Sequence, residues 1–408
     1  MSVVRFSRGA MASKPLPAQL CNRSVRRLAP MLALMAWLTG VPALAHDACQ
    51  DLYINPQRHY QHNTADAVRT PAALPAGEPL GAVTYRLPGS GEAKTLESFL
   101  GAYCTTAFLV LKDGKLVFER YLQGTDGGDH FLSASMSKTL LALLVGMAID
   151  EGKLRLDERV RDILPDFQDS AFADVTVEQL LRMSSGVALV NSFQPGAEAD
   201  NVETNPIATP RQNVLAYLRS KKQSAAPAGT VFDYNGANTA LLGALLRARW
   251  GGASLTEQLQ HRLWQPMGAE SSAGWITNYR GEEGVQGQFF AVARDYARLG
   301  LLVMNGGRAA DRALVPTDWI ARMTELRRDV PQPPAPPWYG LHAWIPQAAG
   351  GRSMFWGVSG QNIFIDPIAK VVIVHLGNSQ RAGFDGNRDL FALRDAIVRT
   401  LVAKDLAH

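Results

Sequence analysis

The stretch Ser135-Met136-Ser137-Lys138 stands at the start of an apolar run that covers residues 139–149. A serine and a lysine three positions apart lie on one face of a helix, so the Ser135 hydroxyl and the Lys138 amine would be neighbours. S-x-x-K arises by chance in about every second chain of this composition, so its meaning depends on its surroundings. A helix that is apolar nearly all round is buried. The stretch therefore predicts a buried helix that begins with a serine-lysine pair, which can activate a nucleophile without histidine.

Strand-like segments occur before and long after this helix. Two β-prone runs, at 107–111 and 116–121, flank an Asp-Gly pair, which is a strong hairpin signal. A second hairpin is predicted where Asp366-Pro367 separates the runs 362–365 and 370–376. Helical patterns cover residues 175–181, 211–219, 238–250, 254–264, 291–304 and 387–402. Strands at both ends with helices between them imply a sheet built from both ends of the chain and a mainly helical lobe, with an active site in the cleft between them.

Composition limits the class of protein. The chain has 408 residues, of which 47% are hydrophobic and 19% charged, as in ordinary globular proteins. Its formal charge of +4 comes from the first 45 residues, which hold six basic and no acidic residues. Nothing therefore indicates a nucleic-acid partner or an anionic membrane partner. No Cys/His cluster has the spacing of zinc ligands, and we expect neither a metal nor an organic cofactor.

Residues 1–45 have the features of an export signal. Two arginines at 26–27 precede an apolar run at 28–38, and Ala-Leu-Ala at 43–45 resembles a signal-peptidase site. We expect cleavage after Ala45 and a periplasmic or secreted protein without stable membrane association, with an uncleaved anchor as the alternative. In an oxidising compartment Cys49 and Cys104 could form a disulfide or stay unpaired, and the sequence leaves this choice open.

Two further segments could contribute to chemistry at Ser135. Tyr234 lies in a Gly- and Asn-rich turn just before a helix, so its phenol could carry a proton from Ser135 to a leaving group while Lys138 polarises it. The alternative is a half-buried packing residue. Residues 353–361 contain small side chains, and their backbone NH groups could bind an oxyanion together with the NH of Ser135. The alternative there is a tight turn beside a strand.

The order of these segments resembles the serine hydrolases related to class C β-lactamases and penicillin-binding proteins, and in motif style most of all the 6-aminohexanoate-oligomer hydrolases. The resemblance covers most of the chain from about residue 100 onward. It rests on S-M-S-K at 135–138, G-K-L-R-L-D at 152–157, I-L-P at 163–165, V-T-V-E-Q-L-L-R-M-S-S-G at 175–186, residues 232–243, A-R-D-Y-A-R-L-G at 293–300 and G-Q at 360–361.

The resemblance implies a β-lactamase/transpeptidase-like fold of the α/β (α+β) class, in which helices flank an antiparallel sheet. After a signal peptide at 1–45, the hydrolase domain would cover 46–408. Its sheet lobe would comprise about 46–134 and 285–408, and its helical lobe about 135–284.

Carried over by position, the resemblance implies that Ser135 is the acylated nucleophile, Lys138 its partner and Tyr234 the general acid/base. The second oxyanion donor beside the Ser135 NH would be the NH of Val358. Candidate substrate contacts are Asn191, Phe193, Asn238, Gly357 and Gln361.

Two features differ from the β-lactam-recognising relatives. The asparagine of their Y-x-N motif is replaced by Gly236, and Lys-Thr-Gly and His-x-Gly are absent, with Arg352 the only cation nearby. The resemblance therefore favours hydrolysis of a small amide or ester over efficient β-lactam hydrolysis. A D-alanyl-D-alanine carboxypeptidase or β-lactamase, a carboxylesterase and a noncatalytic periplasmic binding protein remain alternatives. The individual substrate and the oligomeric state stay open.

Overall fold

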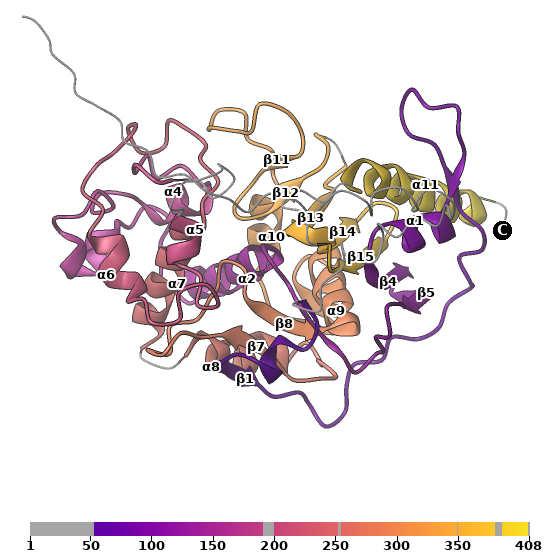
Figure 1. Ribbon diagram of the computed structural model, residues 1–408, viewed down its shortest axis with the longest axis horizontal. Coiled ribbons are helices and arrows are strands. Elements are labelled where there is room, and N and C mark those ends of the chain that lie inside the picture. Colours follow the sequence, from indigo (N-terminus) through magenta and orange to yellow (C-terminus); the bar gives the residue numbers. More distant parts are fainter. Residues whose placement is uncertain (1–52, 191–199, 252–253, 349, 380–385, 407–408) are drawn as a thin grey trace, which may run out of the picture. The chain divides into compact units, whose positions relative to one another are not determined.

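Both ends of the chain contribute to one large sheet. The computed structural model describes residues 53–190, 200–251, 254–348, 350–379 and 386–406. Seven antiparallel strands follow the order β11-β12-β13-β14-β15-β4-β5, so that the early strand β4 pairs with the late strand β15 (Figure 1). These strands are β4 (Thr105–Lys112), β5 (Lys115–Tyr121), β11 (Trp338–Tyr339), β12 (Trp344–Ile345), β13 (Ser353–Trp356), β14 (Asn362–Asp366) and β15 (Val371–Gly377).

Smaller sheets complete the β structure. A four-stranded sheet has the order β1-β7-β8-β6, and two strand pairs, β2-β3 and β9-β10, stand apart from it. Their bounds are β1 (His62–Ala65), β2 (Thr84–Tyr85), β3 (Lys94–Thr95), β6 (His130–Leu132), β7 (Ala273–Ile276), β8 (Phe289–Val292), β9 (Arg308–Ala309) and β10 (Arg312–Ala313).

Most of the helices lie between β6 and β7 in the sequence. They are α2 (Met136–Asp150), α3 (Val160–Ile163), α4 (Val177–Leu181), α5 (Asp200–Glu203), α6 (Val214–Arg219), α7 (Gly236–Trp250) and α8 (Leu255–Leu259). The remaining α-helices are α1 (Leu96–Ala102), α9 (Ala293–Met304), α10 (Thr317–Met323) and α11 (Asn387–Asp405). Short helical turns are η2 (Pro56–Arg58), η3 (Pro165–Phe167), η4 (Gln260–Trp264) and η5 (Val358–Gly360).

Both predicted hairpins are confirmed. β4 and β5 join through Asp113 and Gly114, whose φ angles of 52° and 76° fit a two-residue turn with two left-handed positions. β14 pairs with β15, and the carboxylate of Asp366 accepts the backbone NH groups of Ile368 and Ala369 in the turn between them. The Asp-Gly and Asp-Pro signals thus fixed where each strand pair reverses.

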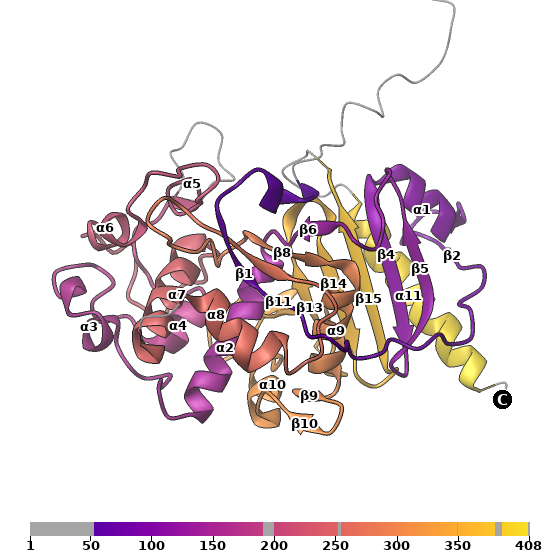
Figure 2. The ribbon, with the colours of Figure 1, turned by 90° about the horizontal axis from the view of Figure 1, so that it is seen from below.

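The large sheet is covered on both faces because its side chains alternate. In β4, Leu109 and Leu111 belong to the core that includes α2 and α9. The alternate residues Phe108 and Val110 belong to a second core, with residues of α1 and α11. Figure 2 shows the strands of this sheet between α9 and α11. An antiparallel sheet flanked by helices, with further helices inserted between its halves, is the fold class that the sequence predicts.

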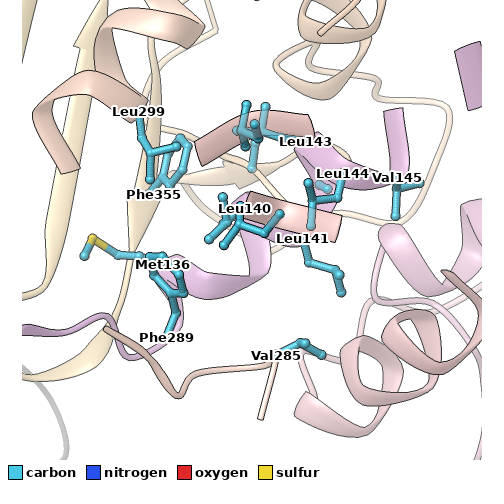
Figure 3. Packing of buried hydrophobic residues seen from close by; sticks show 14 of the residues in the cluster. Met136, Leu140, Leu141, Leu143, Leu144, Val145, Val285, Phe289, Leu299 and Phe355 are labelled. Atoms are coloured by element: carbon cyan, nitrogen blue, oxygen red, sulfur yellow. The ribbon is translucent and has the colours of Figure 1, made fainter. Parts of the chain in front are cut away.

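Helix α2 is buried on nearly every side, as predicted. Its residues 136–148 are all buried, and Figure 3 shows Leu140 and Leu144 among side chains from other elements, including Phe355 and Val285. At Gly146 a Cβ atom would lie only 2.1 Å from the ring of Trp319, whose indole donates to the Ala142 carbonyl at 2.9 Å. This packing fixes the position of the helix that follows Ser135.

Three predictions on how the chain is divided are not tested by the structure. The signal peptide and its cleavage after Ala45 fall on residues that are not described, and the lobe boundaries at 134/135 and 284/285 stay predictions. Among the residues that are described, no helix combines the length and the apolar character needed to cross a membrane.

Candidate active site

Ser135 lies between strand β6 and helix α2. It occupies the N-cap position of α2, but its side chain caps no backbone NH, so its hydroxyl is not used to begin the helix. Ser135 is partly exposed, whereas the neighbouring hydroxyl residues Ser133 and Ser137 are fully buried. Of these three serines, only Ser135 is therefore accessible to a substrate.

Lys138 contacts Ser135 from the next turn of the helix. Its Nζ donates to the Ser135 Oγ at 3.0 Å and also to the backbone carbonyl of Gln286. The side chain is buried, and in the described part of the chain no carboxylate lies within ion-pair distance of it. Burial without a compensating charge lowers the pKa of Lys138 to about 7. Near neutral pH a large fraction of this amine is therefore unprotonated and able to accept a proton.

Tyr234 contacts the same hydroxyl from the turn before α7. It precedes Asn235, the N-cap residue of α7, whose Oδ1 accepts the Ala237 NH at 2.9 Å. Burial raises the pKa of Tyr234 to about 12, and hydrogen bonds with Ser135 and Trp344 oppose that rise. The Lys138 Nζ lies 5.2 Å from the centre of the phenol ring. The phenol therefore keeps its proton at neutral pH and is placed to donate it.

Ser135 thus shares contacts with a base and an acid of separated pKa values. The amine of Lys138 can take the hydroxyl proton, since its pKa lies near 7. The phenol of Tyr234 can give a proton to a departing group, since its pKa lies near 12. This arrangement is suited to nucleophilic attack by Ser135 on a carbonyl carbon.

The turn after β13 approaches the backbone of Ser135 closely. A Cβ atom on Gly357 would lie 2.8 Å from the Ser133 carbonyl oxygen and 2.9 Å from the Ser135 nitrogen. The next residue, Val358, begins η5. Within the described residues, neither the NH of Ser135 nor that of Val358 donates a hydrogen bond. Both NH groups thus lack an acceptor among these residues, and their binding of an oxyanion stays a prediction.

We predict that Gly357→Ala lowers kcat/KM about 100-fold, because the new methyl group would push the Val358 turn away from Ser135. The measurement is steady-state hydrolysis of p-nitrophenyl butyrate by folded protein. Gly101→Ala in α1 is the matched control, since no atom lies within 4 Å of its added Cβ. If Gly357→Ala has the same kcat/KM as Gly101→Ala, the close approach at Gly357 is not required for activity.

Among the described residues, none of the remaining predicted substrate contacts is hydrogen-bonded to Ser135. Asn238 is fully buried in α7, and its amide donates to the Met183 sulfur at 3.7 Å. Gln361 is also fully buried and donates to the Gly377 carbonyl. Asn191 and Phe193 lie outside the described residues. Substrate contact by these residues stays a prediction, and the structure gives Asn238 and Gln361 partners within the protein.

Two contacts near Ser135 were not predicted from the sequence. The Gln286 carbonyl accepts from Lys138, and a backbone carbonyl leaves no signal in the amino-acid sequence. Trp344 reaches Tyr234, with ring centres 5.3 Å apart. Among the described residues, no group of three or more His, Cys, Asp or Glu side chains could hold a metal ion.

His342 also connects the helices around the site, which its sequence position did not indicate. Its Nδ1 lies 2.7 Å from the Leu181 carbonyl, so this nitrogen carries the proton and donates. Nε2 then accepts from the Thr239 hydroxyl at 3.0 Å, and the His342 carbonyl accepts from Thr139 at 2.6 Å. Burial lowers the pKa of His342 to about 3. The neutral imidazole therefore joins α4 to α7, and the backbone carbonyl of His342 adds a contact with α2.

Comparison with known proteins gives consistent matches. The beta-lactamase family model matches residues 94–397. The 6-aminohexanoate-dimer hydrolase of Paenarthrobacter ureafaciens is 29% identical over 332 residues, which cover 77% of this chain and 82% of that protein. A solved Bacillus anthracis structure, assigned as a 6-aminohexanoate-dimer hydrolase, has a TM-score of 0.76 at 23% identity and covers 87% of this chain and 94% of its own. A family VIII carboxylesterase structure has a TM-score of 0.56 at 18% identity, covering 74% and 93%.

The family match extends over most of the chain and includes the segments that carry Ser135, Lys138, Tyr234 and Val358. The solved structures share the arrangement of sheet and helices. The chain belongs to the beta-lactamase family and is a hydrolase of the serine hydrolase type.

Proposed function

We propose that the protein is an exported serine hydrolase that cleaves a small amide or ester through an acyl-serine intermediate. The observation that carries this proposal is the contact of one partly exposed hydroxyl, that of Ser135, with both a low-pKa amine and a protonated phenol. The similarity to a 6-aminohexanoate-dimer hydrolase supports a linear amide as one substrate class.

Acylation follows from these contacts. The Ser135 proton passes to the neutral amine of Lys138 while Oγ forms a bond to the substrate carbonyl carbon. The carbonyl oxygen becomes an oxyanion, which accepts the NH groups of Ser135 and Val358. As the carbonyl carbon–leaving group bond breaks, Tyr234 gives its proton to the departing nitrogen or oxygen. The Lys138 ammonium then returns a proton to the Tyr234 phenolate.

Deacylation reverses the roles with water as the nucleophile. A water molecule loses a proton to the same amine–phenol pair and attacks the acyl carbon. The tetrahedral intermediate collapses, the product acid leaves, and Ser135 Oγ regains a proton. The balance is one water consumed for each amide or ester bond cleaved, and no other reactant is needed.

The segment at 353–361 and the adjacent Arg352 bear on substrate preference. In β-lactam-recognising relatives a cation there helps to bind the substrate carboxylate, and Arg352 is the nearest cation in this sequence. Its Nε donates to the Asp366 carboxylate at 2.5 Å and its Nη1 to Gln347 at 2.8 Å. Arg352 is thus engaged within the protein, which favours a linear amide or an ester over a β-lactam. The carboxylesterase neighbour keeps an ester-only activity as the second candidate.

Export is part of the same proposal. Its support is the leader at residues 1–45, with its arginine pair, apolar run and Ala-Leu-Ala triplet. Cys104 is disulfide-bonded, which suits an oxidising compartment; the proposed pairing with Cys49 lies outside the described residues. We therefore place the mature protein in the periplasm or the medium.

One preparation tests activity and export together. We expect the protein recovered from the periplasm or medium to begin at His46 and to hydrolyse p-nitrophenyl butyrate and the linear 6-aminohexanoate dimer. Because Arg352 is engaged with Asp366, we expect kcat/KM for nitrocefin to be at least about 100-fold lower than for the ester.

Each result that differs from these expectations contradicts a different part of the proposal. A preference for nitrocefin would contradict the proposed substrate class, and turnover of the ester alone would favour a carboxylesterase. Absence of all turnover, together with no labelling by a fluorophosphonate, would favour a noncatalytic binding protein. A start upstream of residue 46 would contradict the cleavage site.

A further inference from the structure

A short segment near the N-terminus, Tyr53–Arg58, contacts the strand that leads to Ser135. The backbone NH of Asn55 donates to the His130 carbonyl at 2.7 Å, and the His130 NH donates to the Asn55 Oδ1 at 3.0 Å. Ile54 forms an antiparallel bridge with Phe131. Asn55 is 6% exposed and adopts a left-handed φ of 50°. This segment is therefore fixed to β6 by several directional contacts.

The same segment reaches the turn that carries Val358. Ser359 Oγ donates to the Tyr53 hydroxyl at 3.1 Å. Ser359 is 4% exposed and has a left-handed φ of 64°, a conformation that a serine adopts only when its surroundings impose it. Burial of Tyr53 raises the pKa of its phenol, so it stays a neutral hydrogen-bonding group.

The backbone of the turn also contacts the protein core. Gln361 donates through its buried amide to the Gly377 carbonyl and, at 3.4 Å, to the Ser359 carbonyl. The Gly357 NH donates to the Gln361 carbonyl at 2.8 Å. The side chain of Ser359, by contrast, is held by Tyr53. Tyr53 thus gives η5 a side-chain contact in addition to those made with β15.

Of the two elements joined by this segment, β6 leads to Ser135 and η5 contains Val358, the two proposed oxyanion donors. Strand β6 ends three residues before Ser135, and η5 begins at Val358. The spacing of the two NH groups depends on how β6 and η5 are held relative to each other. An oxyanion hole is sensitive to displacements well below 1 Å, because its donors must meet the oxygen of the transition state.

We propose that Tyr53 is a positioning residue that sets the geometry of the oxyanion hole by holding Ser359 while its neighbours Ile54 and Asn55 are fixed to β6. This role rests on the proposed acyl-serine function. It assigns part of the catalytic geometry to a segment that precedes the first strand and lies outside the residues matched by the family model.

The test is Tyr53→Phe, which removes only the hydroxyl that accepts from Ser359. We expect kcat for p-nitrophenyl butyrate to fall about fivefold to tenfold, as for loss of one buried hydrogen bond, with KM changed less than about twofold. Tyr60→Phe is the matched control. Tyr60 lies in the same part of the chain, packs beside Leu132 and Phe290, and its hydroxyl makes no hydrogen bond among the described residues. We expect Tyr60→Phe to keep wild-type kcat.

Two further measurements separate positioning from a loss of folded protein. Rates are expressed per site titrated with a fluorophosphonate, so an unfolded fraction does not count. The Ki of an alkyl boronic acid, whose serine adduct places an oxygen in the oxyanion hole, should rise by the same factor as kcat/KM falls. Ser359→Ala should give a similar loss, and the double variant Tyr53→Phe/Ser359→Ala no more than either single change.

The outcomes distinguish this inference from the proposed function. Wild-type turnover without fluorophosphonate labelling would contradict the acyl-serine proposal itself. If the wild type is labelled but Tyr53→Phe equals Tyr60→Phe in kcat and in boronate Ki, the positioning role of Tyr53 is wrong. Additive losses in the double variant would equally overturn it.

Discussion

Replacing Ser135 by alanine is expected to lower kcat/KM for p-nitrophenyl butyrate at least about 10⁴-fold, because the nucleophile is lost while the fold is kept. The variant should also lose covalent labelling by a fluorophosphonate. Stability should change little, since Ser135 caps no backbone group and is partly exposed. Thermal unfolding checks the last point, and stopped assays with purified protein check the first.

The residue that the fluorophosphonate labels in the wild type gives a more specific test than loss of activity alone. Mass spectrometry should place the label on Ser135 and not on Ser133 or Ser137, both of which are fully buried. Ser220→Ala, at an exposed position after α6, should keep full activity. Undiminished hydrolysis by Ser135→Ala, or a label on another serine, would show that the proposed mechanism is wrong.

Lys138→Met is expected to lower kcat/KM about 10³-fold and at the same time to stabilise the protein. The loss of activity follows from removal of the base beside Ser135. The gain in stability follows from burial of the amine. Lowering its pKa from 10.5 to about 7 costs about 4 kcal/mol of folding free energy at pH 7. The Gln286 carbonyl would lose its partner, which costs about 1–3 kcal/mol, so we expect a net gain of about 1–3 kcal/mol.

Both the stability and the activity should depend on pH through the Lys138 amine. The folded state holds Lys138 at a lowered pKa, so the destabilisation is complete below about pH 7 and is lost as the pH rises towards 10.5. The cost of burying the amine should therefore fall from about 4–5 kcal/mol at pH 6 to about 2 kcal/mol at pH 9, so that the stability advantage of the variant falls to about zero. Wild-type kcat/KM should rise through a pKa of about 7, as the amine loses its proton.

Lys153→Met is the control for this pair of measurements, because Lys153 is exposed just after α2. It should change neither the activity nor the pH dependence of unfolding. A Lys138→Met variant that is less stable than wild type at pH 6, or a wild-type profile without an inflection near pH 7, would contradict the assigned state of Lys138.

Local sequence signals were sufficient for much of the fold. The Asp-Gly pair at 113–114 predicts its hairpin because few other dipeptides adopt two left-handed conformations in succession. The pattern at 175–181 contains α4, which the Thr176 hydroxyl caps by accepting the Gln179 NH at 3.2 Å. Helix boundaries were less accurate. The pattern at 211–219 predicted a helix from residue 211. The observed helix α6 begins at Val214, because the Asn213 side chain caps it.

The sequence alone determined the order of the chemical groups and the pairing of Ser135 with Lys138, because one helical turn separates them and helix geometry is local. Only the tertiary structure decided the environment of that pair. The carbonyl that Lys138 contacts belongs to Gln286, which is 148 positions away. The turn pressed against Ser135 comes from Gly357, and the hydroxyl that supports this turn comes from Tyr53. A pKa depends on desolvation and an oxyanion hole on sub-ångström spacing, and both are set by distant segments that meet only when the chain is folded.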